Sequence, residues 1–379
     1  DSQVLLSDVF SVPEDSTGLG WPHWLPGWDD VLPLGAAYTV RALREARTSM
    51  LDRRTFVTFG SAALVGLAAQ WALVEPERLT AAIGGKRVDP DLVGWLESTG
   101  AKLTGLPTKQ RQHTAVLLDA HLATVTDLVD GGRYSEPIGL RLHSLAAQLA
   151  VACGWYRFDQ GRHPAAGKLW NAALRSAHAS GDRDLGAGVL SDFAYQAMWL
   201  KDPGTAVEVL GFALTRTTHP TARSLLGLRK ARAHAALGES VECHGELSAA
   251  EGEFSRRTAD PAPSWCAWMS PADLAVDAGQ CFLDLGRPDV ADGLIGDGMA
   301  LLPRSRDKTR AVFLAARARA FLQRGDVEQA AAVTDESLDL AQRIGAERCV
   351  TMVRDLVPEF RRFPAVDGVP ELLERLRAA

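Results

Sequence analysis

A helix-and-turn pattern that recurs at a nearly constant spacing determines what the second half of this chain can fold into. Five tight turns follow apolar stretches without helix breakers, and a small residue appears about five positions after each turn. The turns contain Gly161, Asp202-Pro203, Gly238, Gly286 and Gly325, and the small residues are Ala166, Ala206, Cys243, Ala291 and Ala330. Successive small residues lie 40, 37, 48 and 39 positions apart. This period is typical of helical solenoids, in which each helix pair buries its apolar face against the next pair.

The rest of the chain also favours helices. From residue 36 onward, alternating runs of β-branched and aromatic residues are nearly absent, and breaker-free stretches with apolar stripes dominate. The beginning differs, because Pro and Gly interrupt helices there and Trp21, Trp24 and Trp28 follow one another closely. We expect an all-α protein in three parts: an irregular arm over 1–34, a helical region over 35–139, and helix pairs with C-terminal capping helices over 140–379.

The finer pattern of the repeats resembles the tetratricopeptide repeat, with helices longer than that family's standard. A small residue about seven positions before each turn lets the two helices of a pair approach closely. These small residues are Gly154, Ala194, Ala231, Gly279 and Ala318. The large position of the second helix is filled by Trp170, Leu210 and Leu247, whereas the last two units depart with Ile295 and Thr334. The resemblance implies a right-handed solenoid of degenerate tetratricopeptide-like helix pairs.

Four stretches carry a wider resemblance. They read MLDRRTF at 50–56, GWYRFDQGRH at 154–163, ARAHAALG at 231–238 and DLGRP at 284–288. Over most of 35–360 the chain resembles actinobacterial transcriptional regulators that join a helix-turn-helix DNA-binding domain of the Cro/repressor type to a tetratricopeptide-like domain. The resemblance implies a regulatory domain that binds a peptide, a small-molecule signal or a protein partner, with a homodimer as one expected assembly. No helix-turn-helix pattern fits in 1–50, so we expect the DNA-binding domain to be encoded upstream.

The sequence contains no pattern that indicates catalysis or metal binding. It lacks a phosphate-binding P-loop, a nucleophile elbow, a zinc-protease motif and a dinucleotide-binding glycine pattern. The five cysteines occur singly and without C-x-x-C spacing. A net charge of −6 argues against nucleic-acid binding by the chain itself, and no apolar run reaches the ~18 residues of a membrane-spanning helix. We expect a cytoplasmic, non-enzymatic protein without cofactors, metals or membrane contact, and with DNA bound only through the upstream domain.

The concave groove of a solenoid, lined by the first helix of each pair, is the candidate binding site. Aromatic rings beside amides and charges of both signs suit an extended peptide, because amides pair with its backbone and rings supply apolar contact. We expect the double change Trp155→Ala with Arg232→Ala to leave folding nearly intact. The candidate groove residues are Gln148, Trp155, Asp159, Asp192, Tyr195, Trp199, Arg229, Arg232, Asp273, Gln280 and Arg319, with Asp284 and Gln323 continuing the line.

Two other functions stay open at this point. One is a stand-alone scaffold or adaptor that has the same repeats and no role at DNA. The other is an exported repeat protein, because Arg53-Arg54 and the apolar run at 61–69 imitate a twin-arginine export signal. An apolar stripe in the same segment favours instead an amphipathic helix that faces the core. It consists of Phe56, Phe59, Ala63 and Leu67.

Overall fold

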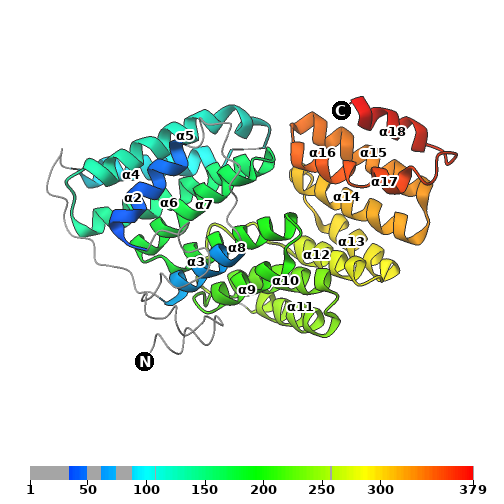
Figure 1. The fold of residues 1–379 in the computed structure, drawn as a ribbon, viewed down its shortest axis with the longest axis horizontal. Helices are drawn as coiled ribbons and strands as arrows, with labels where there is room; N and C mark the ends of the chain where they lie inside the picture. The colour runs from blue at the N-terminus through cyan, green and yellow to red at the C-terminus, as the bar shows by residue number, and fades with distance from the viewer. Residues whose placement is uncertain (1–33, 49–60, 74–87, 107, 257, 379) are drawn as a thin grey trace, which may run out of the picture. The chain divides into compact units, whose positions relative to one another are not determined.

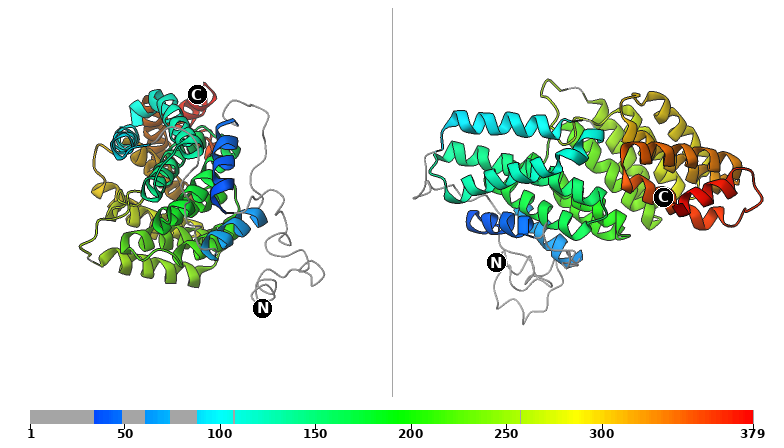
Figure 2. Two further views of the ribbon diagram at one scale, coloured as in Figure 1. Left: turned by 90° about the vertical axis from the view of Figure 1, so that its left-hand side faces the viewer. Right: turned by 90° about the horizontal axis from the view of Figure 1, so that it is seen from above.

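The computed structural model describes residues 34–48, 61–73, 88–106, 108–256 and 258–378. Within these residues the fold is all-helical and contains no strand, as the sequence predicts (Figures 1 and 2). The expected arm over 1–34 lies outside them except for its last residue. The helices are α2 (Ala36–Thr48), α3 (Ser61–Leu73), α4 (Pro90–Thr104), α5 (Thr108–Gly131), α6 (Glu136–Asp159), α7 (His163–Ser180), α8 (Arg183–Trp199), α9 (Pro203–Leu214), α10 (Pro220–Leu237), α11 (Ser240–Ser255), α12 (Pro271–Asp284), α13 (Pro288–Leu301), α14 (Asp307–Arg324), α15 (Val327–Ile344), α16 (Glu347–Arg354), α17 (Val357–Phe360) and α18 (Val369–Ala378).

The described residues form two compact units. The first contains α2–α4 and the helix pairs up to α9, and the second contains α10–α18. The boundary between α9 and α10 falls after the second of the five predicted repeats. The first unit comprises the described residues of Asp1–Gly105, Ala115–Phe158 and Arg162–Thr218, and the second those of Leu106–Thr114, Asp159–Gly161 and His219–Ala379.

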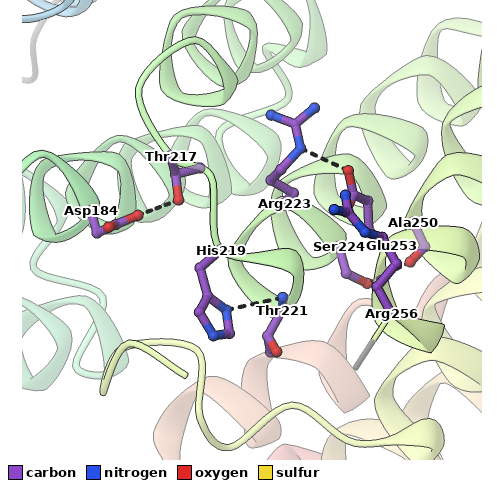
Figure 3. Close-up of polar contacts among 9 residues, drawn as sticks. All are labelled: Asp184, Thr217, His219, Thr221, Arg223, Ser224, Ala250, Glu253 and Arg256. Carbon is purple, nitrogen blue, oxygen red and sulfur yellow. Dashed lines mark hydrogen bonds and ion pairs between the residues drawn. The ribbon is translucent and has the colours of Figure 1, made fainter. Parts of the chain in front are cut away.

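Helices that follow one another in the sequence pack side by side in pairs. Figure 1 shows this for α8 with α9, α10 with α11, α12 with α13, and α14 with α15. In the α10/α11 pair, Arg223 Nε donates to Glu253 Oε1 at 2.8 Å, and Ser224 Oγ donates to the Ala250 carbonyl at 2.7 Å (Figure 3). These bonds fix the two helices at the end where His219 caps α10.

A residue in the left-handed conformation closes each of the five predicted turns. Four of these residues are glycines with φ between 70° and 83°, namely Gly161, Gly238, Gly286 and Gly325. The fifth is Lys201, with φ 66°, directly before the predicted Asp202-Pro203 turn. In every case the next residue donates its backbone N–H to a carbonyl five positions back, as Asp202 does to Ala197 at 2.9 Å. The turns are therefore equivalent in geometry, although one of them lacks glycine.

The small residues predicted in the first helices lie where the paired helices touch. A Cβ atom on Gly154 would lie 2.3 Å from Nε1 of Trp170, and one on Gly279 would lie 2.7 Å from Cγ1 of Ile295. Contacts this short do not occur between packed atoms, so these helices reach their spacing only with glycine. The corresponding residues of the other pairs are buried as well, namely Ala194, Ala231 and Ala318.

The N-terminal helices α2 and α3 cover the first unit, where α2 packs on α7 and α3 packs on α9. Leu67 and Trp71 of α3 are fully buried, and Arg183 Nη1 donates to the Trp71 carbonyl at 2.9 Å. The apolar run that imitates an export signal thus lies in a packed helix. Its twin arginines and two phenylalanines lie outside the described residues. In the part of the chain that the structure describes, no helix is long and apolar enough to cross a membrane.

The Lys201 turn makes a direct prediction about stability. A residue with a Cβ atom is strained in the left-handed conformation, and glycine is not. Lys201→Gly should therefore raise the free energy of unfolding by about 1 kcal/mol, as measured by urea denaturation followed by circular dichroism. The reverse change at an equivalent turn, Gly238→Lys, should lower it. Equal stability of wild type and Lys201→Gly would contradict this account of the turns.

The Gly154 contact predicts the opposite effect of an added methyl group. Gly154→Ala should lower the free energy of unfolding by about 2 kcal/mol, because its Cβ overlaps the Trp170 indole in a closely packed core. Gly245→Ala is the matched control, since Gly245 lies inside α11 with no atom within 4 Å of the added Cβ. That change should be neutral or stabilising by up to ~1 kcal/mol. If the Gly154→Ala chain were as stable as the control, α6 and α7 could move apart without a loss in the free energy of unfolding.

Candidate functional site

Four polar residues line one face of α12 in the second unit. They recur at intervals of four, three and four positions, which places them on a single helix face. Asp273 at the start of this line forms a capping box with Ser270, and Arg306 donates two hydrogen bonds of 2.8 Å to its two carboxylate oxygens. We call the four residues the α12 stripe: Asp273, Asp277, Gln280 and Asp284.

Cations of the two neighbouring first helices face the α12 stripe. Arg232 of α10 places Nη1 3.1 Å from Oδ1 of Asp277, and Arg319 of α14 places Nη2 2.7 Å from Oδ1 of Asp284. Within the stripe, Gln280 Nε2 donates to Oδ1 of Asp277 at 3.0 Å. Charge pairs therefore connect α10, α12 and α14 in sequence, and Asp277 lies at the centre of this network.

The Asp277 carboxylate lies at a partly buried position. Burial raises its pKa above the ordinary value for aspartate, and the Arg232 guanidinium opposes that rise. The Asp273 carboxylate adds to the rise, whereas Arg229, one turn before Arg232 on α10, also opposes it. The side chains of Asp277 and Arg232 keep 28% and 22% of their surface exposed. A ligand can thus reach this pair from the solvent side.

The first unit carries a second candidate surface, which is aromatic. Trp155 of α6 donates its indole N–H to Oδ2 of Asp192 in α8 at 2.9 Å. The ring centroids of Trp155 and Tyr195 lie 5.5 Å apart. Phe158 lies 5.7 Å from Tyr195 and 5.8 Å from Trp199, with edge-to-face geometry that favours aromatic pairs. The structure thus brings three predicted groove aromatics together around the Phe158 ring, which was not predicted, and Asp192 is bonded to one of them.

Two predicted residues have other partners. Gln148 is exposed on α6, and its Nε2 donates to Oγ of Ser144 at 3.3 Å. Asp159 is grouped with the second unit, where it pairs with Arg348 at 2.9 Å and also with Lys308. Burial lowers the pKa of Lys308, and the Asp159 carboxylate opposes that change. The Gln148 contact is a neutral hydrogen bond and those of Asp159 are ion pairs, and none of them connects either residue to the α12 stripe.

The sequence reasoning missed Asp277, Phe158 and Arg306. Asp277 lies one helical turn after Asp273, so the spacing of polar residues on this helix was a sufficient signal. Phe158 lies on the same helical face as the predicted groove aromatic one turn earlier, which was a weaker signal of the same kind. Arg306 has no such signal, because it lies before α14 and reaches a carboxylate 33 positions earlier.

Comparison with known proteins does not indicate a function for this chain, so a function has to be inferred from the geometry of the two surfaces. No protein-family model matches the chain, and no curated protein sequence matches it. Among the residues that the structure describes, no group of three or more His, Cys, Asp or Glu side chains is placed to hold a metal ion. The α12 stripe offers hydrogen bonds from an amide and from paired charges. The aromatic surface of the first unit offers apolar contact from partly exposed rings.

The contacts of Trp155 and Arg232 change what their removal is expected to do. The sequence alone predicts that both side chains can be removed with little effect on folding. In the structure Trp155 packs against other rings and binds Asp192, and Arg232 compensates the charge of Asp277. Both residues therefore support the fold, and their removal does not isolate an effect on ligand binding.

Arg232→Ala should lower the free energy of unfolding by about 2 kcal/mol, because it leaves the Asp277 carboxylate partly buried without its cation. The folded-state pKa of Asp277 lies above its unfolded value, so its ionised form costs stability that is regained as pH falls through the folded pKa. The deficit of the variant should accordingly shrink in acid. Urea denaturation at several pH values measures both effects.

Two further variants control this prediction. Arg232→Leu combined with Asp277→Leu removes both charges and should recover most of the lost stability. Arg256→Ala removes an arginine that is 64% exposed and pairs with Glu253, so it should change stability by less than ~0.5 kcal/mol. An Arg232→Ala chain no less stable than Arg256→Ala would mean that solvent alone satisfies Asp277.

Proposed function

We propose that this chain is the non-catalytic sensor and interaction domain of a bacterial transcriptional regulator, and that it binds an extended peptide or protein segment on the surface of its first helices. The finer fold that we propose with it is a right-handed solenoid of tetratricopeptide-like helix pairs. The observation that supports the binding role most directly is the α12 stripe, held between the arginines of α10 and α14.

The charge pairs between successive first helices support this surface as the binding face. In the second unit, Arg232 of α10 and Arg319 of α14 both pair with carboxylates of α12, and the Gln280 amide lies on the same helix. The seams beneath are filled by buried residues of the second helices, such as Cys243, Ile295 and Ala330. A ligand that binds along the first helices therefore meets polar side chains without opening a seam between helices.

The chemistry of the α12 stripe matches an extended chain. A peptide backbone presents alternating N–H and C=O groups, which carboxylate oxygens and the Gln280 amide can satisfy. The carboxylates are held in place by their arginines before a ligand arrives, so little side-chain ordering remains to be done on binding. The aromatic surface of the first unit offers apolar contact of the kind that anchors peptides.

The regulator part of the proposal rests on the sequence resemblance described above. A bound peptide would favour one arrangement of the helix pairs, and that shift in population would reposition an attached DNA-binding domain. Coding sequence upstream of Asp1 separates a regulator from a stand-alone scaffold, because only the former continues into a helix-turn-helix domain.

Selection of binders from a display library of random linear peptides tests the binding role. The full chain should enrich peptides, and Gln280→Met should weaken the enriched peptides roughly fivefold, the value of one lost hydrogen bond. Met preserves the length of the side chain and removes its amide. Isothermal titration calorimetry measures the affinities, and circular dichroism checks the fold.

The matched control is Gln342→Met, which makes the same replacement at an exposed position on the second helix α15. This variant should bind the selected peptides as wild type does. Failure to enrich any peptide would contradict the binding role. Equal weakening by both variants would place the binding surface away from the α12 stripe.

A further inference from the structure

The outer face of α4 in the first unit carries a line of four exposed residues with opposite charges at its two ends. The four residues recur at intervals of four, three and four positions, so they lie on one face of the helix. Trp95, inside this line, keeps 61% of its surface exposed. In order along the helix they are an acid, an aromatic residue, a hydroxyl residue and a base, and we call them the α4 line: Asp91, Trp95, Ser98 and Lys102.

The opposite face of α4 fixes this line in place. Leu96 and Gly100 are buried there, and His121 of α5 donates from Nε2 to the Leu96 carbonyl at 2.8 Å. Arg141 of α6 donates two hydrogen bonds of 2.9 and 2.7 Å to the carboxylate of Glu97. The α4 line therefore projects from a helix that two neighbouring helices hold in position.

Apolar side chains of α5 extend the exposed surface beside Trp95. The rings of Trp95 and His121 meet edge-on with centroids 6.5 Å apart. Leu117 lies one turn before His121 on α5, and both Leu117 and Val116 keep more than half of their surface exposed. Leu92, one turn before Trp95 on α4, is exposed as well. Large apolar side chains that gather in solvent in this way mark an interaction surface.

The order of residues in α4 makes this face complementary to itself. Positions 91 and 102, 92 and 101, and 95 and 98 share one midpoint. When two copies of α4 pack antiparallel about a two-fold axis at that midpoint, each of these positions meets its counterpart on the other copy. Each contact then joins unlike charges or a large and a small side chain: Asp91 with Lys102, Trp95 with Ser98, and Leu92 with Ala101.

The charges at the two ends of the α4 line are available for such contacts. In the described part of the chain, Asp91 and Lys102 form no ion pair, whereas Glu97 of the same helix pairs with Arg141 at 2.7 Å. Exposed ion pairs add little affinity, but unlike charges at both ends select the antiparallel direction and the register of two helices. Charge complementarity therefore indicates a second copy of this chain as the occupant of this surface.

We propose that α4, with Val116 and Leu117 of α5, is a self-association surface at which two copies of the chain pack with their α4 helices antiparallel. Trp95 lies next to the two-fold axis and is covered by α4 of the second copy. The surface contains only a few large side chains, which suits a dimer that forms at micromolar concentrations. The association does not depend on the proposed peptide binding, because it uses other helices.

Sedimentation equilibrium of the full chain over about 1–200 µM tests the proposal. The wild-type chain should shift from monomer to dimer over this range. Trp95→Ser should weaken the association about 100-fold, because each copy loses the large side chain at the centre of the interface. The matched control is Trp268→Ser, which removes an exposed tryptophan of the second unit and should leave the dissociation constant unchanged. Circular dichroism checks the fold of each variant.

Two charge reversals test the antiparallel arrangement. Asp91→Lys and Lys102→Asp each place like charges opposite one another, so each variant alone should associate at least ~10-fold more weakly than wild type. Mixed in equal amounts, the two variants should associate as strongly as wild type, because every end contact then joins unlike charges. A wild-type chain that stays monomeric, a Trp95→Ser chain that associates as wild type does, or a mixture that associates no better than either variant alone would overturn the proposal.

Discussion

Close approach of paired helices is the constraint on which the rest of this structure depends. Glycine at 154 and 279 places one helix backbone directly against a large side chain of its partner, Trp170 in one pair and Ile295 in another. Protein cores are packed too densely to accept an extra methyl group at such a contact. The spacing of the pairs, and with it the direction in which each outer face points, is set by these few small residues.

The charged surface of the second unit follows from that spacing. With α10, α12 and α14 held by their seams, the carboxylates of α12 come within hydrogen-bond distance of Arg232 and Arg319. Long side chains lose conformational freedom when they form such pairs, and the fixed helices reduce that loss. The result is a polar surface whose side chains are already ordered, so little conformational entropy remains to be lost if a ligand binds there.

The small residue of each second helix shows what the seams require. Cys243 occupies the position that Ala166 and Ala291 occupy in other pairs, and all three side chains are fully buried. Cysteine satisfies the packing requirement of such a position as alanine does. The size of the side chain, rather than one residue type, is therefore what this place in the helix pair selects.

The sequence by itself determined the helices, the turns and the small and large positions of the seams, because these depend on residues close together in the chain. Glycine at a turn and an apolar stripe at helical spacing act locally. Only the tertiary structure decided that Lys201 takes the left-handed conformation without glycine, that Arg232 meets Asp277 across 45 positions, and that the chain divides between α9 and α10. A contact such as that of Arg232 with Asp277 depends on how far one helix pair is displaced along the next. That displacement is the sum of many packing contacts, and no single residue signals it.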